Sequence, residues 1–371
     1  MSEQSKQTSI KAYGLTRLGQ PSDVLHVVEV PKPQPGPRDL LVRVVAVATN
    51  PVDVKQITNW GGDPNVPIES PPLIPGWDAS GVVEAVGAEA TLFKPGDEVY
   101  FAGAINRAGS FAEYTVVDER IVGRKPSSLI HEDAAALPLT SLTAWEMLVE
   151  GFGIPVPADV GDETVNRNKT LLVLGGAGGV GSIALQIAKH VLKIGRVIGS
   201  ASRAETVAYC KAHGADYTIN HRNPLADELA QLGLKGVDFI FNTSEPDPVI
   251  EQLIELVNPL GKIGHILPIQ KPVNTAPLFM KRGSLVWEMM FARGVYGVEP
   301  ERQGAILNRV ASLVDSKVLR STANVRFAWD KLAEALALQG SGRAIGKIVL
   351  TVAFHVRLPS TGQSMRNFAF F

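Results

Sequence analysis

The sequence predicts an α/β fold in two parts, a β-rich, barrel-like domain and a doubly wound parallel sheet. Up to about residue 125 the chain is rich in Val, Pro and Gly, and its short apolar runs are separated by turn signals such as KPGD. From Thr170 onward, short strands of the buried type alternate with helical patterns. Strict alternation of strand and helix is typical of βαβ units, which build parallel sheets.

The overall composition is that of an ordinary globular protein. The 371 residues are 20% charged and 45% apolar, which is enough for two domains with a core in each. The formal net charge of −1 provides no global attraction to nucleic acid or to an anionic membrane, so neither is expected as a partner. No apolar run reaches the about 18 residues that a membrane span needs.

The chain start and the cysteine content predict a cytoplasmic location. Residues 1–9 are polar and lack the apolar core of a signal peptide. The single cysteine, Cys210, excludes an internal disulfide and fits a reducing compartment.

The strands of the first part are predicted at 39–49, 80–87, 97–103 and 111–117. The Pro- and Gly-rich stretch 57–72, which contains Trp60, forms either one wall of a substrate pocket or an exposed loop.

The second part is predicted to follow a long loop over 152–169 and to begin with the strand TLLVLGG. Four more strands are predicted, with the sequences RVIGSAS, DYTINH, VDFIFNT and GKIGHIL. Helical patterns lie between the strands at 179–192, 204–214, 224–233 and 247–259. The segment 284–291 offers a sixth strand, in which Trp287 and Met289 are expected to lie in the core rather than in a pocket.

The C-terminal part is predicted to rejoin the first domain. A helix that begins near residue 303 leads to GKIVLTV, a strand that is expected to return to the barrel, and the tail 353–371 shows no pattern that we can interpret. The predicted domains are therefore residues 1–134 with 304–371 and residues 135–303.

A glycine-rich loop follows the first strand of the parallel sheet. Gly176, Gly178 and Gly181 form a G-x-G-x-x-G pattern that also includes Gly179 and Val180 and opens a helix. We expect Gly176 to serve the tight turn, Gly178 to let the backbone approach a pyrophosphate, and Gly181 to let helix and strand pack closely. With the strand, the helix and further βα units in place, this pattern predicts a dinucleotide site.

The residues after the second strand favour NADPH. An NAD site usually has a carboxylate there, and this chain has Ser202 and Arg203, with Glu205 already in the next helix. An arginine suits a 2′-phosphate, and His221, which ends the third strand, is placed to reach it too. The alternatives are a solvated residue at a helix start for Arg203 and a plain surface histidine for His221.

Several motifs together resemble the medium-chain dehydrogenase/reductase superfamily, most closely its quinone-oxidoreductase-like branch, often labelled zinc-type alcohol dehydrogenase-like. The motifs are NPVDVK from Asn50, GWDASG from Gly76, FKPGDEVY, AAALPLTSLTAWEML, the glycine loop and GRAIGKIVL. The resemblance covers about residues 10–352. It implies a GroES-like barrel, an inserted Rossmann domain and a C-terminus that returns to the barrel.

The zinc ligands of metal-dependent members are missing from the matching motifs. Asn50 stands near the position of the family's cysteine ligand and Trp77 at that of its histidine, and Cys210 lies in a Rossmann helix. Catalytic zinc needs three protein ligands, of which Asp78 could supply one. No metal is expected: Asp78 is predicted to cap a turn or orient a neighbour, and Trp77 to pack under the cleft.

Reduction without a metal requires a substrate that is already electron-poor, such as a quinone or an α,β-unsaturated carbonyl compound. Lys55 is the candidate donor to the developing oxyanion, since the resemblance places a Tyr there in quinone reductases and a Lys in trans-acting enoyl reductases. Asn50 resembles the family residue near the nicotinamide. A solvated lysine is the alternative for Lys55.

Further residues are predicted to line the cofactor, either from strand ends or by resemblance. Their alternatives are helix capping and packing for the threonines of the helix that enters the Rossmann domain, and a simple strand lysine for Lys347. The residues are Thr140, Thr143, Asn242, Thr243, Ile266, Leu267 and Lys347.

The expected function is a zinc-independent, NADPH-dependent reductase of quinones or activated double bonds, acting on a small electrophilic substrate. The alternatives are an NADPH-binding sensor or structural protein without turnover, and an enoyl reductase acting in trans on carrier-bound substrates. A homodimer is expected. The segment 284–291 is a candidate for the edge strand that pairs in it, since its apolar residues suit an interface, although they suit a core as well.

Overall fold

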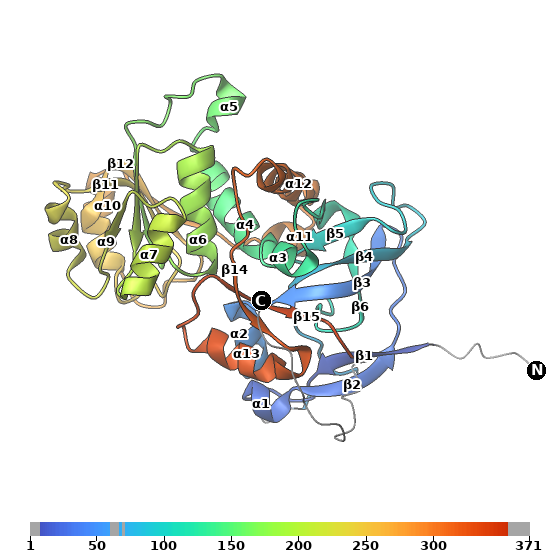
Figure 1. Ribbon diagram of the computed structural model, residues 1–371. Helices are drawn as coiled ribbons and strands as arrows, with labels where there is room; N and C mark the ends of the chain where they lie inside the picture. The colour runs from blue at the N-terminus through green and yellow to red at the C-terminus, as the bar shows by residue number, and fades with distance from the viewer. Residues whose placement is uncertain (1–7, 60–66, 69–70, 355–371) are drawn as a thin grey trace, which may run out of the picture.

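The computed structural model describes residues 8–59, 67–68 and 71–354, and it confirms the predicted fold class (Figure 1). The strands are β1 Ser9–Gly14, β2 His26–Pro31, β3 Asp39–Ala48, β4 Asp78–Val86, β5 Glu98–Phe101, β6 Tyr114–Asp118, β7 Val122–Arg124, β8 Thr170–Leu174, β9 Arg196–Ser200, β10 Tyr217–Ile219, β11 Val237–Asn242, β12 Val257–His265, β13 Ser284–Trp287, β14 Ala323–Phe327 and β15 Lys347–Thr351. The α-helices are α1 Pro21–Val24, α2 Pro51–Asn59, α3 His131–Ala135, α4 Pro138–Trp145, α5 Pro157–Val160, α6 Gly179–Gln186, α7 Ala204–Ala212, α8 Leu225–Gln231, α9 Ile250–Leu256, α10 Ala276–Met280, α11 Ala292–Tyr296, α12 Glu301–Asp315 and α13 Leu332–Gly340.

The six strands β8 to β13 form an all-parallel sheet in the order β10-β9-β8-β11-β12-β13. The strand order reverses between β8 and β11, which is the place where doubly wound sheets bind ligands at the carboxyl ends of their strands. All five strands predicted from Thr170 onward are present, and the segment 284–291 supplies β13 at the edge.

The parallel sheet is buried on both faces, as its near-continuous apolar strands require. In β8, Leu171 and Val173 point to the core shared with α6, whereas Leu172 and Leu174 point to the core shared with α8 and α9. All four side chains are buried. The alternation follows from the two-residue period of a strand, and it places helices on both sides of the sheet (Figure 1).

The barrel-like part is built on a seven-stranded sheet in the order β14-β15-β3-β4-β5-β7, with β6 also paired to β3. The strand β15 runs antiparallel to β3, from Val349 opposite Ala48 to Thr351 opposite Ala46. The predicted return of the C-terminal strand to the first domain is therefore correct, although the boundaries at 134 and 304 stay a prediction.

One apolar core runs through the junction between the two parts. Trp77 and Tyr100 from the barrel belong to the same buried cluster as Leu142 of α4, Leu171 of β8 and Val310 of α12. The helices α4 and α12, which connect the two parts, pack on one another and on the barrel. The junction is therefore a packed interface rather than a loose linker.

The expected helices form with shorter bounds. The first, expected over 179–192, is α6 followed by a π-helical turn over Ile187–Val191, and a similar turn over Glu146–Gly151 follows α4. The long loop 152–169 contains only the short helix α5, which projects from the body of the molecule (Figure 1).

The prediction that Trp287 and Met289 lie in the core is wrong. The exposed fractions are 55% for Trp287 and 50% for Met289, because β13 is the edge strand of the sheet. An apolar run does not tell an edge strand from a central one. Trp60, most of the stretch 57–72 and the tail beyond residue 354 lie outside the described residues, while Ile57 to Asn59 end α2.

No helix among the described residues is long and apolar enough to cross a membrane.

Candidate functional site

The glycine loop joins β8 to α6 in a conformation that side chains would obstruct. Gly175 is left-handed, with a φ of 77°, so it takes the tight turn that was expected of Gly176. A Cβ on Gly181 would lie 2.2 Å from the carbonyl oxygen of Gly175, which confirms the close packing of helix and strand. Gly178 is the N-cap of α6, so the first-turn N–H groups of Gly179 and Val180 face the loop without intrahelical partners.

An open basic pocket lies beside the glycine loop, at the carboxyl end of β9. Its volume is about 480 Å³, and it is lined by Arg203, Glu205, Arg222, Arg343 and Ile345. The loop that carries Arg343 is held against the glycine loop, because Gly346 N donates a hydrogen bond to Ala177 O at 2.9 Å. Three arginines from three separate segments therefore meet at one place.

Arg203 is the centre of this pocket. Its Nε donates to Glu205 Oε1 at 2.7 Å, and its Nη2 donates to the backbone oxygen of Arg343 at 3.3 Å. His221 is exposed and is not among the residues that line the pocket, although desolvation, together with the positive charges of Arg222 and Arg203, lowers its pKa. Ser202 precedes Arg203 and is half-buried.

The side chains at the end of β11 bond to the backbone at the end of β8 and to the residues that follow β11. Thr243 Oγ1 donates to Leu174 O at 2.7 Å, which holds the threonine against the glycine loop. Asn242 is fully buried, and its Oδ1 accepts from the backbone N–H and the hydroxyl of Ser244. Both residues therefore stabilise the conformation of the chain at the ends of these two strands.

Fully buried His265 ends β12 and is followed by half-buried Ile266 and Leu267. Its Nδ1 lies 3.3 Å from Asn242 Nδ2, and its Nε2 has no hydrogen-bond partner among the described residues. Burial lowers the pKa of His265 to about 4, so the ring is neutral at neutral pH.

Thr140 and Thr143 bond to the backbone of their own helix. Thr143 Oγ1 donates to Leu139 O at 2.8 Å, and Thr140 Oγ1 lies 3.2 Å from Leu137 O. The methyl group of Thr140 would lie 3.2 Å from a Cβ on Gly179, so this threonine contacts the glycine loop. Both side chains serve the helix, as the packing alternative proposes, and Thr140 also borders the predicted cofactor site.

Lys347 is the hub of a buried polar network between the barrel and the glycine loop. Its Nζ donates to Asp78 Oδ2 at 2.8 Å, to Thr49 O at 2.7 Å and to Asn50 Oδ1 at 2.5 Å. These bonds use all three ammonium protons. The Lys347 side chain is 3% exposed and its stem packs on Gly179, so it is not a simple strand lysine.

Asp78 completes this network. Its Oδ1 accepts from Leu139 N, in the first turn of α4, at 2.8 Å, and its Oδ2 accepts from Asn50 Nδ2 at 2.9 Å as well as from Lys347. The carboxylate thus caps α4 from outside the helix and orients Asn50. The prediction that Asp78 orients a neighbour is confirmed.

Asp53 lies next to this network and caps the helix α2. Its Oδ2 accepts from Asn50 N, as the third residue of a capping box does, while its Oδ1 has no partner among the described residues. Complete burial raises the pKa of Asp53 to about 8. The residue is therefore largely a neutral acid at neutral pH.

Lys55 lies on α2 rather than in a loop, and its side chain reaches a residue that follows a strand of the parallel sheet. Its Nζ is 3.6 Å from Oε1 of Glu245, which follows β11, and the two side chains are 48% and 70% exposed. The pair spans from the barrel to the carboxyl end of the sheet. An ion pair this exposed contributes little to stability, so Lys55 is free to exchange partners.

The residues at the positions of the zinc ligands are poorly suited to coordinate a metal. Trp77 is 1% exposed, and its ring meets the ring of Phe291 edge-on with the two centroids 5.7 Å apart, so it is packed in the core at the junction of the two parts. Its position under a substrate cleft stays a prediction. The carboxylate of Asp78 already accepts from an ammonium group and two N–H groups. Among the described residues, no group of three His, Cys, Asp or Glu side chains is arranged to hold a metal.

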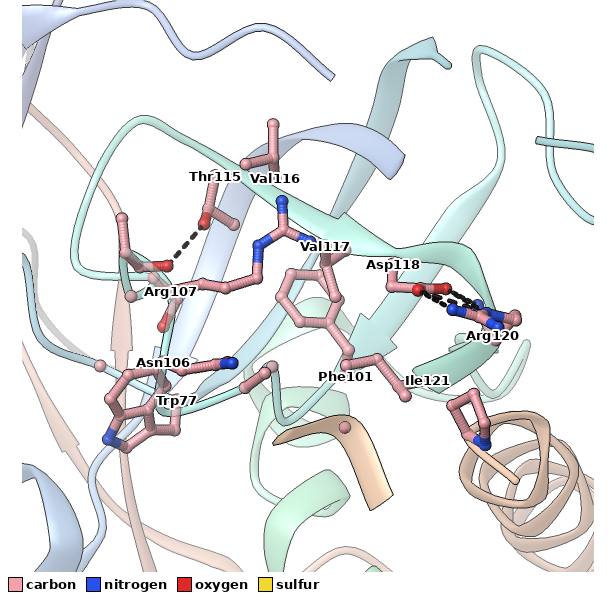
Figure 2. A pocket seen from close by; sticks show the side chains of 18 of the residues that line it. Trp77, Phe101, Asn106, Arg107, Thr115, Val116, Val117, Asp118, Arg120 and Ile121 are labelled. Atoms are coloured by element: carbon pink, nitrogen blue, oxygen red, sulfur yellow. Dashed lines mark hydrogen bonds and ion pairs between the residues drawn. The ribbon is translucent and has the colours of Figure 1, made fainter. Parts of the chain in front are cut away.

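A second cavity, of about 100 Å³, is lined by Trp77 and Phe101 among other residues (Figure 2). Arg107 and Arg120 border it, but Arg107 is bonded to Asp39 and Arg120 to Asp118. The cavity includes none of the residues predicted for the cofactor, and we assign no ligand to it.

Sequence reasoning did not find four of the residues in these clusters. Arg222 and Arg343 come from loops far from Arg203 in the chain, and no local sequence motif indicates that they lie near it. Glu245 comes from a loop without a motif of its own. The capping role of Asp53 was detectable, because an acid three residues after Asn50 fits a capping box.

Two family models match the chain. The alcohol dehydrogenase GroES-like domain matches residues 36–127, and the zinc-binding dehydrogenase model matches residues 213–350. The zinc-type alcohol dehydrogenase-like protein of Staphylococcus epidermidis is 35% identical over 325 residues, which are 86% of this chain and 92% of that protein. The 2-methylene-furan-3-one reductase of Solanum lycopersicum is 30% identical over 353 residues, which are 92% of this chain and 79% of that protein.

Solved structures agree with these relatives. A Rhizobium etli protein described as a zinc-dependent alcohol dehydrogenase is 40% identical, with a TM-score of 0.84 and coverage of 93% of this chain and 99% of that one. A mycobacterial protein complexed with NADPH is 26% identical, with a TM-score of 0.76 and coverage of 92% and 100%. The resemblance carried by the motifs is confirmed: the chain belongs to the medium-chain dehydrogenase/reductase superfamily and is an oxidoreductase related to enzymes that use a nicotinamide cofactor.

Proposed function

We propose that the protein is a zinc-independent, NADPH-dependent reductase of α,β-unsaturated carbonyl compounds and quinones. The observation that carries the proposal is the buried Lys347–Asp78 pair, because a protein cation already satisfies the one carboxylate at the expected metal position. The residues present therefore do not fit a catalytic zinc, although relatives carry zinc in their names. The substrate must then accept hydride without a Lewis acid.

The cofactor site fits a dinucleotide with a 2′-phosphate. The glycine loop and the first turn of α6 suit a pyrophosphate, and a Cβ on Gly179 would lie 3.0 Å from the Lys347 stem, so this position favours glycine. Arg203, Arg222 and Arg343 supply guanidinium groups for the phosphate on the ribose. The mycobacterial relative with bound NADPH supports this choice.

NADPH would supply the hydride, and the residues of this chain would orient the substrate and handle its charge. We assign Lys55 to the developing oxyanion, because its ammonium group is half-exposed between the barrel and the parallel sheet, and its one ion pair among the described residues is with the exposed carboxylate of Glu245. Asn50 is held by Asp78 and Lys347, so its amide has a single orientation beside the glycine loop. The tomato relative is named as the reductase of an enone, 2-methylene-furan-3-one, which supports α,β-unsaturated carbonyl compounds as the substrate class.

The test is NADPH oxidation by the chelated protein, with a 2-alkenal and phenanthrenequinone as acceptors and NADH in parallel. Turnover that survives chelation and prefers NADPH supports the proposal, and the better acceptor separates enone from quinone chemistry. Loss of activity on chelation, with recovery on added zinc, overturns it. NADPH binding without turnover on any electrophile points to a sensor or to a carrier-dependent enzyme.

We also propose that the protein forms a homodimer through β13. Among the described strands, β13 has a neighbour on one side only, and Trp287 in this strand and Met289 just after it are exposed. Light scattering during size exclusion should give twice the chain mass of 39.7 kDa for the wild type. The Trp287→Glu variant should run as a monomer, whereas Val160→Glu, at an exposed apolar residue of α5, should remain a dimer. A monomeric wild type contradicts this proposal.

A further inference from the structure

Glu205 is a carboxylate inside the basic pocket. It stands at the second position of α7, after the N-cap Arg203, and its exposed side chain lines the pocket together with the three arginines. The sequence placed Glu205 in the helix that follows Arg203, and the predicted cofactor residues did not include it. The structure instead brings its Oε1 to 2.7 Å from Arg203 Nε.

The guanidinium group of Arg203 keeps donors free while it holds Glu205. An arginine has five N–H donors in a planar fork. One is given to Glu205 and one to the backbone oxygen of Arg343, so three remain for another ligand. An anion can therefore reach Arg203 without displacing Glu205, and the carboxylate then stays next to that anion.

We propose that Glu205 is a specificity-determining residue that weakens the preference of this pocket for a 2′-phosphate and so admits NADH as well as NADPH. The inference rests on the proposed cofactor site. A phosphate with about two negative charges is repelled by the carboxylate, whereas an uncharged 2′-hydroxyl is not repelled and can donate a hydrogen bond to it. Glu205 thus weakens the binding of NADPH but not that of NADH, so it lowers the ratio of the two affinities.

The neighbouring arginines and the solvent limit how strongly Glu205 repels a 2′-phosphate. Arg222 and Arg343 add two positive charges that have no carboxylate partner among the described residues, so the pocket as a whole still attracts a phosphate. The Arg203 and Glu205 side chains are 36% and 60% exposed, so solvent and salt screen the repulsion. We expect a several-fold change in discrimination, and we expect it to depend on ionic strength.

The experiment measures binding of two fragments, 2′,5′-ADP and 5′-AMP, by calorimetry, so that it needs no turnover. The protein is compared with Glu205→Gln and with Glu251→Gln, which removes the same charge at the same second position of another helix, α9. For Glu205→Gln we expect about fivefold tighter binding of 2′,5′-ADP at low salt, with 5′-AMP unchanged or weaker. In about 1 M salt the gain should fall below about twofold, because the Debye length is then about 3 Å.

Two outcomes overturn the inference, and they are distinguishable. If the wild type prefers 2′,5′-ADP and Glu205→Gln binds it no more tightly than Glu251→Gln does, Glu205 does not set the specificity. If neither the wild type nor Glu205→Gln prefers 2′,5′-ADP, the phosphate site itself is wrong, and the proposed NADPH preference fails with it. In turnover assays the same variant should raise the ratio of kcat/KM for NADPH over NADH by a similar factor.

Discussion

The ammonium group of Lys347, in β15, donates a 2.8 Å hydrogen bond to the carboxylate of Asp78, in β4, and both side chains are buried. The pair lies where the barrel meets the glycine loop of the parallel sheet, because the Lys347 stem contacts Gly179 and Asp78 caps the helix α4. A buried ion pair of this kind adds little net stability but is costly to break from one side. It therefore fixes the relative position of Asn50, α4 and the glycine loop.

Removal of one partner of this pair should destabilise the protein strongly. Lys347→Met leaves the Asp78 carboxylate buried with only N–H partners, so we expect a loss of about 3–5 kcal/mol in the free energy of unfolding. Asp78→Asn should also destabilise, since it leaves the ammonium group buried. Urea unfolding of both single variants and of the double variant measures the coupling. The double variant should lose clearly less than the sum of the two single losses, and strict additivity would contradict the pairing.

Lys55 is predicted to act on the substrate and not on the cofactor. Lys55→Met should lower kcat with an alkenal by about 10²–10³, the usual cost of losing one donor to an oxyanion, while the Kd for NADPH stays within about twofold. Lys55→Arg, which keeps the charge, should retain more activity than Lys55→Met. Lys94→Met, at an exposed turn of the barrel, serves as the matched control and should behave as wild type. Equal activity of Lys55→Met and Lys94→Met would remove Lys55 from the mechanism.

The fold was predictable because its buried strands are near-continuous apolar runs with helical patterns between them, so the parallel sheet follows from local sequence. The contacts of the site were less predictable. Arg203 was detectable because it follows the second strand directly, whereas Arg343 reaches the same pocket through the return of β15 to the barrel. That approach is a tertiary event with no local signature. The exposure of Trp287 depends likewise on which strand ends at the sheet edge.

Asp53 should make the protein less stable as the pH rises. Burial raises its pKa from 3.8 to about 8, so between these values the native state binds a proton that the unfolded chain has released. The stability that this proton provides is full below about pH 4 and is lost as the pH rises to about 8. Asp53→Asn keeps an acceptor for Asn50 N and does not titrate. Its stability relative to wild type should improve by about 3–4 kcal/mol between pH 5 and pH 8, since one pKa unit corresponds to about 1.4 kcal/mol, and urea unfolding would measure this.

The control for this comparison is Asp53→Ala, which loses the capping hydrogen bond. It should be less stable than Asp53→Asn at every pH, by about 1 kcal/mol. A difference between Asp53→Asn and wild type that does not vary with pH would show that Asp53 is ionised in the native state.

His265 should make the protein less stable as the pH falls, which is the opposite pH dependence to that of Asp53. Burial lowers its pKa from 6.5 to about 4, so in this window the unfolded chain binds a proton that the native state does not. Stability should therefore be lost as the pH falls from about 6.5 to about 4, by about 3 kcal/mol from this residue alone, since one pKa unit corresponds to about 1.4 kcal/mol. His265→Asn removes the titrating ring and retains an amide near Asn242. Its unfolding free energy should fall less steeply over this range, whereas His26→Asn, at an exposed residue of β2, should follow the wild-type slope. Parallel slopes for His265→Asn and His26→Asn would mean that the ring of His265 is not shielded from solvent protons.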